Sequence, residues 1–461
     1  MGISFSQGCN TEAILKYIQN TTNDGVRLRA MRMYRKGETM SAAFAPHKES
    51  DRMHLYSLSK SFTSVCVGIA QDMGLLSVDE KMLDIFPECA PAEVSEYLAQ
   101  MTLGDVLSMQ SGHEVCHLNQ MRFSENAVKT FLAMPVVYKP GTTFVYSTGG
   151  TCVCGAAVEK RAGMKLADFM DKYLFEPLGI KKPHVLTLAD GTHTGGIGIF
   201  LSIDDLFRFG MMLLRGGEYN GKRIVSKAYL DKATSAIADN SCNGTPDWVA
   251  GYGYQFWQNA RCGFRGDGAY GQLLVVLPEE DTVFALQAEA SNMQAEMDRI
   301  YELLDSVDCR NPVSEMKLAS AVASYNDAPV SAPAATRTVT LAPNPAEIKN
   351  ATLSQDGNVL TVRFETAYGV QILKAGDGTW AESHPMLRYC NPSIKMLDPH
   401  FGHIETLNIR SHFVTDGDTV KIVCKHIDTP HTQTFAFGKD ALDISAVLGD
   451  LHADVKHIPY C

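Results

Sequence analysis

The sequence lacks the features of a nucleic-acid-binding or membrane-spanning protein. Its 461 residues include 41 Lys and Arg against 52 Asp and Glu, giving a formal net charge of −11. Such an acidic chain has no positive surface for phosphate backbones. No apolar run reaches the roughly 18 residues that a membrane helix needs. Residues 1–20 lack the basic start and continuous apolar core of a signal peptide. We therefore expect no nucleic-acid partner, no membrane segment and a cytoplasmic protein, or a periplasmic or extracellular one if a leader has been removed.

The 12 cysteines show no metal or redox spacing. Cys152 and Cys154 are two residues apart, which is not the CxxC spacing of zinc or thioredoxin sites. Most of the others stand in apolar contexts, as Cys66 does, which is typical of small buried side chains. The cysteines predict no disulfide framework, and the chain shows no dinucleotide or Walker motif, so we expect no cofactor.

The composition and hydrophobic pattern of the chain change after about residue 310. Residues 1–310 mix helical and strand patterns, whereas residues 311–338 are rich in Ala, Ser and Pro and indicate a linker. In residues 339–461, alternating apolar stretches flank turn signals such as Asp356-Gly357. We expect this last part to be a small antiparallel all-β domain.

Five elements can be placed in the large domain. The apolar periodicity and end signals predict helices over Ser57–Met73, Leu103–Gln110, Ser202–Arg215 and residues 293–305. Two apolar runs joined by residues 278–281 predict a hairpin of Gln272–Leu277 with Thr282–Ala288.

The first chemical candidate is Ser57-Leu-Ser-Lys60. A serine hydroxyl needs a base within hydrogen-bond reach, and the i,i+3 spacing places Lys60 on the same helix face as Ser57. The Ser57 N–H at the helix start is a candidate oxyanion donor. Phe62, Val65, Ile69 and Met73 would face a core. Ser314-Glu-Met-Lys317 has the same spacing, but we expect it in the linker, without helix packing to bury a lysine.

Two further segments are weaker by themselves. Tyr146, in FVYSTGG, is either a proton relay beside a nucleophile or an ordinary core or turn tyrosine. Gly266-Asp267-Gly268, before the predicted hairpin, permits close backbone approach to a ligand, or forms a simple glycine turn.

A literal HExxH occurs at residues 113–117. On a helix, His113 and His117 would be zinc ligands and Glu114 a general base. Ser111-Gly112 precedes the motif directly, which favours a loop after a helix end. A zinc metallohydrolase therefore stays only as an alternative from another class, and we expect no metal.

Taken together and in order, six blocks over about residues 25–305 resemble the class C β-lactamase-like serine hydrolases. The blocks are HLYSLSKSFTSVCVGIAQDMGLLSVDEKMLDIFPE, TLGDVLSMQSGH, KPGTTFVYSTGG, FLSIDDLFRFGMMLLRGGEYNGKRIVS, GYGYQFW and GAYGQLLVVLPEEDTVFAL. The group includes β-lactamases, penicillin-binding D,D-peptidases, D-aminopeptidases, family VIII carboxylesterases and nylon-oligomer hydrolases. The resemblance implies an α+β fold, in which an antiparallel sheet is flanked by helices and carries a helical subdomain.

The resemblance also implies roles for residues. Ser57 and Lys60 match the nucleophile and the base, and Tyr146 matches the tyrosine of the Tyr-x-Asn motif. Ala269 would supply the second oxyanion N–H, beside that of Ser57.

The substrate-contacting positions of the family fall on Thr148, Gly266, Asp267 and Gly268. Thr148 replaces the usual Asn, and Gly266 stands where the family has a Lys or His.

These observations predict a serine hydrolase that forms a Ser57 acyl-enzyme with small ester, amide or short peptide-like substrates. A true β-lactamase and a D,D-peptidase remain alternatives within the class. A catalytically silent binding protein is an alternative outside it, because sites can decay on an intact fold.

Overall fold

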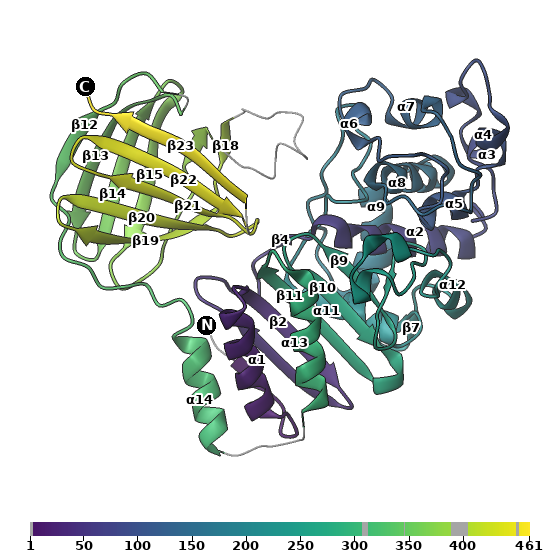
Figure 1. The fold of residues 1–461 in the computed structure, drawn as a ribbon, viewed down its shortest axis with the longest axis horizontal. Helices are drawn as coiled ribbons and strands as arrows, with labels where there is room; N and C mark the ends of the chain where they lie inside the picture. Colours follow the sequence, from purple (N-terminus) through teal and green to yellow (C-terminus); the bar gives the residue numbers. More distant parts are fainter. Residues whose placement is uncertain (1–2, 307–311, 345, 389–403, 449–450) are drawn as a thin grey trace.

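The structure is a computed structural model that describes residues 3–306, 312–344, 346–388, 404–448 and 451–461. Two parts lie side by side (Figure 1): a mixed helical and sheet part from the N-terminal portion of the chain, and an all-β part from the C-terminal portion. The predicted α+β class with an added C-terminal β domain is confirmed.

The mixed part is built on a seven-stranded antiparallel sheet. Its strand order is β1-β3-β2-β11-β10-β9-β8. The bounds, in that order, are Ile3–Phe5, Glu38–Ala43, Arg27–Arg35, Thr282–Glu289, Gln272–Leu277, Phe264–Gly268 and Trp257–Gln258. The predicted hairpin is β10 with β11, whose register runs from Gln272 opposite Gln287 to Leu277 opposite Thr282.

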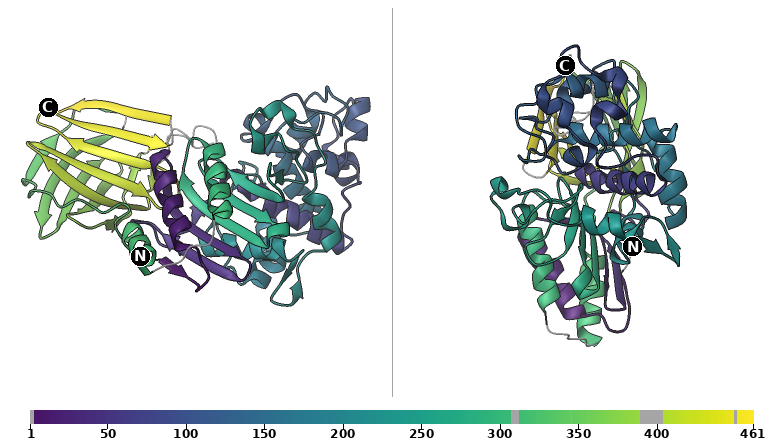
Figure 2. Two further views of the ribbon diagram at one scale, coloured as in Figure 1. Left: turned by 60° about the horizontal axis from the view of Figure 1, so that its bottom comes forward. Right: turned by 90° about the vertical axis from the view of Figure 1, so that its right-hand side faces the viewer.

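Helices cover both faces of this sheet, which is why its central strands are apolar on both sides. Helices α1 (Thr11–Asn23) and α13 (Met293–Asp305) lie together on one face, and α11 (Ile203–Leu214) lies on the other (Figures 1 and 2). The ends of α11 agree with the sequence, since Ser202 caps it in a capping box with Asp205.

The helical subdomain is centred on α2 (Ser59–Asp72) and α8 (Thr148–Ala162), which pack against each other. The smaller helices are α3 (Met82–Ile85), α4 (Glu96–Gln100), α5 (Leu103–Leu107), α6 (Leu118–Met121), α7 (Ala127–Ala133), α9 (Leu166–Met170), α10 (Glu176–Leu178) and α12 (Lys227–Ala233). Two short strand pairs complete this part: β4 (Met53–His54) with β5 (Phe200–Leu201), and β6 (Glu218–Tyr219) with β7 (Lys222–Arg223).

Two predicted helices differ from the observed ones at their ends. The helix expected from Ser57 begins as a 3₁₀ turn, Tyr56–Leu58, and becomes α-helical only at Ser59. Phe62, Val65 and Ile69 are buried, but Met73 at the C-terminal end is exposed, so its expected place in the core is wrong. The helix expected over Leu103–Gln110 ends at Leu107.

The C-terminal domain is a curled ten-stranded sheet ordered β12-β13-β14-β15-β19-β20-β21-β22-β23, with β16 paired to β19. A bridge between Leu341 and Tyr460 joins the two ends of the curl. The predicted Asp356-Gly357 turn joins β13 to β14. The bounds are β12 Arg337–Thr340, β13 Ile348–Asp356, β14 Val359–Thr366, β15 Gly369–Gly376, β16 Ala381–Ser383, β19 Ile409–Asp416, β20 Thr419–His426, β21 Thr432–Phe437, β22 Ala441–Leu448 and β23 Leu451–Pro459, with β17 Met386–Arg388 and β18 Ile404–Thr406 as a separate pair.

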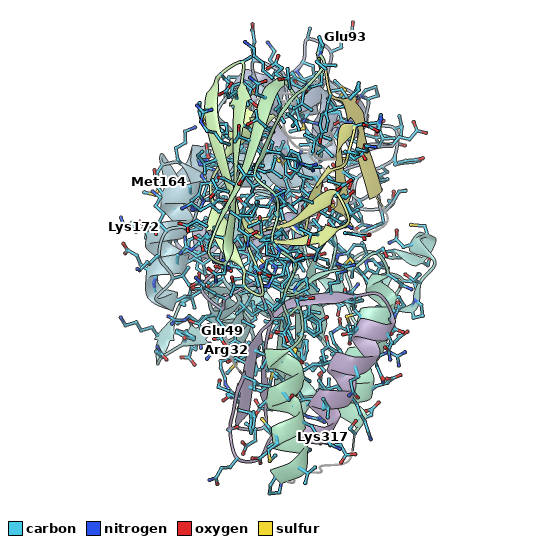
Figure 3. The ribbon with its side chains drawn as sticks, turned by 90° about the vertical axis from the view of Figure 1, so that its left-hand side faces the viewer. Arg32, Glu49, Glu93, Met164, Lys172 and Lys317 are labelled. Atoms are coloured by element: carbon cyan, nitrogen blue, oxygen red, sulfur yellow. The ribbon has the colours of Figure 1, made fainter. Side chains whose placement is uncertain are left out.

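The second Ser-x-x-Lys copy lies in a helix, which corrects the expectation of an unpacked linker. Helix α14 (Pro312–Ala323) packs on α1, and the Ser314 hydroxyl is buried 2.6 Å from Thr11 Oγ1. Leu318 and Val322 form the buried face that the sequence interpretation missed. Lys317 is labelled on this helix in Figure 3, which shows α14 beside α1. Ser314 is thus a packing residue.

Within the described part of the chain, no helix is both long and apolar enough to cross a membrane.

A buried carboxyl lies beneath the turn that joins β9 to β10. Glu296 on α13 is fully buried, and a Cβ added to Gly271 would lie 2.6 Å from its Oε1. Burial raises the pKa of Glu296 to about 8, because the charged form would lose its hydration. The carboxyl group is therefore neutral at pH 7 and packs as an uncharged group against the turn.

We predict that Glu296→Gln makes the protein more stable at high pH. In the unfolded chain Glu296 has its ordinary pKa, so between about pH 4.5 and pH 8 the unfolded state loses this proton before the folded state does. Native stability therefore falls across that window, and the isosteric amide removes this loss. We expect the stability of Glu296→Gln relative to wild type to rise by roughly 2–4 kcal/mol from pH 5 to pH 9. Denaturant unfolding at both pH values measures it, and an unchanged difference contradicts the buried, protonated state.

Candidate active site

Ser57 lies at the junction of the sheet part and the helical subdomain. It occupies the centre of the 3₁₀ turn directly before α2, and it is partly exposed, whereas its neighbours Tyr56 and Leu58 are buried. The turn therefore presents one hydroxyl to solvent from an otherwise buried segment. That combination of access and fixed position is what a nucleophile needs.

Lys60 lies one turn further and is only 2 % exposed. Its Nζ donates hydrogen bonds to Ser57 Oγ at 3.0 Å, to Thr148 Oγ1 at 3.0 Å and to the Gly196 carbonyl at 2.8 Å. Burial lowers the pKa of Lys60 to about 8, although nearby acidic groups, Asp267 among them, partly oppose the shift. A substantial fraction of neutral amine near pH 8, in contact with a serine hydroxyl, is the arrangement of a general base.

The Tyr146 ring also lies against Lys60. The Lys60 ammonium lies 4.9 Å from the centre of the Tyr146 ring, and that ring stacks on Trp257 at 5.5 Å. Burial raises the pKa of Tyr146, and its hydrogen bond with Ser57 opposes this only in part. The phenol is therefore neutral, and it contacts both Ser57 and Lys60.

Strand β9 passes directly against the 3₁₀ turn that carries Ser57. A Cβ on Gly268 would lie 2.0 Å from the Leu55 carbonyl oxygen, and one on Gly266 would lie 2.8 Å from Ser61 Oγ. These two glycines are required because any side chain would push the strand away from the turn. Ala269, the next residue, is exposed and follows directly after Gly268, which meets the segment just before Ser57.

Asp267 points to the opposite face of β9, together with Arg265. Asp267 Oδ2 lies 3.2 Å from Arg265 Nη2, and both side chains are buried. Burial raises the pKa of Asp267, and the Arg265 guanidinium opposes the shift. The guanidinium lies 4.2 Å from the centre of the Trp248 ring and donates to the Gln258 carbonyl at 2.8 Å. Arg265 is therefore held in the interior by its own partners.

The HExxH segment forms a loop. His113 pairs with Val136 in an isolated bridge, His117 precedes α6, and Glu114 is exposed. The Glu114 carboxylate therefore does not share a helix face with two histidines, as the zinc motif requires. Among the described residues, no group of three or more His, Cys, Asp or Glu is arranged to hold a metal ion.

Sequence reasoning missed two partners of Lys60 and Tyr146. The Gly196 carbonyl comes from the segment before β5, and a Cβ there would lie 2.9 Å from Thr148 Cγ2. Trp257 on β8 carries the stacking face for Tyr146. The Gly195-Gly196 pair was the only sequence signal for the Gly196 carbonyl. Nothing in the local sequence pattern marked Trp257. Thr148, predicted to contact substrate, has its hydroxyl engaged with Lys60.

One known family matches the part of the chain that contains these residues. The beta-lactamase family model matches residues 25–306, more than half of the chain. The chain belongs to the beta-lactamase family. Its predicted relationship to the β-lactamase-like serine hydrolases is thereby confirmed, and the protein is a serine hydrolase.

Relatives of this beta-lactamase-family hydrolase are distant. A 6-aminohexanoate-dimer hydrolase from Paenarthrobacter ureafaciens is 26% identical over 270 residues, which cover 53% of this chain and 67% of that protein. A lovastatin esterase from Penicillium rubens is 28% identical over 165 residues, 31% of this chain and 41% of that protein. The match therefore spans less than half of the esterase.

The fold likeness reaches into the C-terminal domain. The structure of an octameric penicillin-binding protein homologue from Pyrococcus abyssi covers 89% of this chain and 97% of its own, with 15% identity and a TM-score of 0.50. Because residues 25–306 make up well under 89% of the chain, this similarity includes strands of the curled sheet.

We predict that hydrolysis by this family member rises with pH through a midpoint near 8. Only the neutral Lys60 amine accepts a proton, and the neutral fraction grows as pH passes the lowered pKa of about 8. Lys60→Arg, which cannot deprotonate, should lose at least 100-fold in kcat/KM with the fold retained. Rates on a neutral ester between pH 6 and 9.5 measure both. A flat profile, or a Lys60→Arg enzyme within about tenfold of wild type, excludes lysine as the base.

Proposed function

We propose that this protein hydrolyses small esters or amides through an acyl-enzyme on Ser57, without a metal ion or cofactor. The 3.0 Å contact between Lys60 Nζ and Ser57 Oγ, with Lys60 buried, is the observation that carries the proposal. It supplies a nucleophile and a base in contact before any substrate arrives.

Acylation follows from this geometry. Ser57 Oγ attacks the substrate carbonyl carbon while its proton passes to Lys60 Nζ. The negative charge that develops on the carbonyl oxygen is met by the N–H groups of Ser57 and Ala269. When the tetrahedral species collapses, the leaving alcohol or amine takes the proton from Lys60 through the Tyr146 hydroxyl.

Deacylation repeats these steps with water as the nucleophile. The water oxygen attacks the acyl carbon, its proton passes to the pair formed by Tyr146 and Lys60, and Ser57 Oγ leaves with a proton. The carboxylic acid is released and the enzyme returns to its acyl-free form with the Ser57 hydroxyl restored, so water is the only co-reactant.

The charges around Gly266-Asp267-Gly268 support the substrate class. Gly266 carries no side chain, and the guanidinium of the adjacent Arg265 is buried against Trp248 and paired with Asp267. A substrate carboxylate beside the scissile bond therefore gains no charge-assisted hydrogen bond from this strand. Neutral esters and amides have no carboxylate that needs such a bond. The names of the two relatives, an amide-dimer hydrolase and an esterase, agree with this class.

The nucleophile is tested by covalent labelling. A fluorophosphonate probe should add one label per chain at Ser57, because its reaction needs an activated serine beside oxyanion donors. Intact mass and peptide mapping identify the site, with Ser57→Ala as the unlabelled variant and Ser314→Ala as the matched control that labels normally. A label on Ser59 or Ser314, or none on folded protein, contradicts the proposal.

The substrate class is tested on one preparation with three substrates. We expect kcat/KM for a p-nitrophenyl ester or a D-alanyl anilide to exceed that for nitrocefin by at least tenfold. The loss of one charge-assisted hydrogen bond costs about 1.5–3 kcal/mol, which corresponds to ten- to a hundredfold. Nitrocefin turnover near the diffusional range with negligible ester and anilide hydrolysis identifies a true β-lactamase. Release of D-alanine from an acyl-D-alanyl-D-alanine peptide above both identifies a D,D-peptidase.

A further inference from the structure

The two residues beside the proposed oxyanion donors share an uncommon backbone conformation. Tyr56 precedes Ser57 with φ of 49°, and Tyr270 follows Ala269 with φ of 66°. For bulky residues other than glycine this left-handed region is costly and persists only where surrounding contacts impose it. The backbone is therefore held in a set geometry next to each donor.

The rings of these two tyrosines contact each other. Their centres are 5.3 Å apart at an interplanar angle of 74°, an edge-to-face packing that favours one relative placement. Tyr56 is buried and Tyr270 is half-buried. The ring pair thus connects the nucleophile turn to the β9–β10 turn, whose backbones already meet at Gly268.

A third ring connects Tyr56 to the C-terminal domain. The His54 ring centre lies 4.2 Å from that of Tyr56 and 4.7 Å from that of Phe200, on which it stacks. The His54 backbone N–H donates to the Asp428 carbonyl at 2.8 Å. Asp428 belongs to the loop between β20 and β21, and Figure 1 shows this end of the C-terminal domain beside β4.

Buried charges hold that loop against the sheet. Arg29 on β2 donates to the His426 carbonyl at 2.9 Å and to Glu289 at 2.7 Å, and Lys425 Nζ lies 3.1 Å from the same carboxylate. All three side chains are at most 10 % exposed. The two cations keep the pKa of Glu289 low, at about 2, despite its burial. Because removing one member leaves a buried charge less compensated, this cluster fixes the two domains strongly to each other.

We propose that Tyr56 and Tyr270 are positioning residues that set the two oxyanion N–H groups at their working separation, and that the C-terminal domain takes part by holding Tyr56 through His54. The proposal rests on the proposed function of Ser57. It follows from transition-state stabilisation, in which donors must lie within hydrogen-bond distance of an oxygen that becomes charged only during reaction. A shift of about 1 Å in one donor is enough to lose much of that stabilisation.

The ring pair is tested at Tyr270, where asparagine keeps the tolerance for positive φ and removes the ring. We expect Tyr270→Asn to lower kcat 10- to 100-fold on a p-nitrophenyl ester while KM changes less than threefold, since a transition-state contact is lost. Tyr270→Phe should recover most of this kcat. Tyr56→Asn should lower kcat similarly, and the double variant should lose less than the product of the two single losses. Tyr97→Asn on α4 is the exposed control.

The domain contribution is tested on strand β20, which offers a matched pair. Lys425→Met removes the buried clamp on Glu289, and Lys421→Met removes the same charge from an exposed position four residues away. We expect Lys425→Met to lower kcat at least fivefold, with KM little changed and a native circular dichroism spectrum, and Lys421→Met to equal wild type. An equal kcat in both variants overturns the role of the domain.

Failure of this proposal is distinguishable from failure of the Ser57 assignment. If wild type is labelled at Ser57 and Tyr270→Asn keeps wild-type kcat, the positioning role is wrong and the nucleophile stands. If loss of kcat in Tyr270→Asn is matched by loss of the folded state, and Tyr270→Phe does not recover it, the role is also overturned. If wild type is not labelled at Ser57, the proposed function itself fails.

Discussion

The removal of one lysine ammonium from water is the constraint on which the site depends. Lys60 is enclosed where α2, α8 and the segment before β5 meet, and its Nζ donates to a carbonyl and two hydroxyl oxygens. No carboxylate among the described residues bonds to it, so desolvation outweighs the compensating attractions and the pKa falls. A direct carboxylate partner would have kept the amine charged and useless as a base. The proposed role of Lys60 as the base therefore requires that no carboxylate bonds to its amine.

The second requirement is that the backbone of β9 lies close to the turn that carries Ser57, and two glycines make this possible. Gly266 and Gly268 allow β9 to lie against the turn that carries Ser57, at distances that no Cβ permits. Glu296, neutral through burial, supports the next turn from below at Gly271. Burial therefore lowers the pKa of Lys60 and raises the pKa of Glu296. Both shifts favour the uncharged form of the group. For Lys60 this gives the neutral amine that the proposed base requires, and for Glu296 it permits tight packing under the site.

The C-terminal domain is connected to this centre by more than a chain linkage. Its β20–β21 loop bonds to His54, two residues before Tyr56, and a buried cluster of Arg29, Glu289 and Lys425 spans the contact. A buried ion cluster contributes little net stability, but it penalises every arrangement that separates the charges. The two domains are thus held in one relative position, which is what a site assembled from short turns requires.

The sequence by itself determined the local elements and the chemical types at the site. Apolar periodicity with a Ser202 cap gave α11 its bounds, and the β10–β11 hairpin followed from two apolar runs around a turn, because these signals depend on neighbours in the chain. The Ser57 and Lys60 pair was also visible, since i,i+3 spacing is itself local. Only the tertiary structure decided which Ser-x-x-Lys copy has a buried lysine: both copies are helical, and Ser314 is buried too, but against α1. Burial of Lys60, its bond to Gly196 and the Tyr56–Tyr270 contact join segments more than a hundred residues apart. Such contacts arise from packing between elements, which leaves no periodic trace in the sequence.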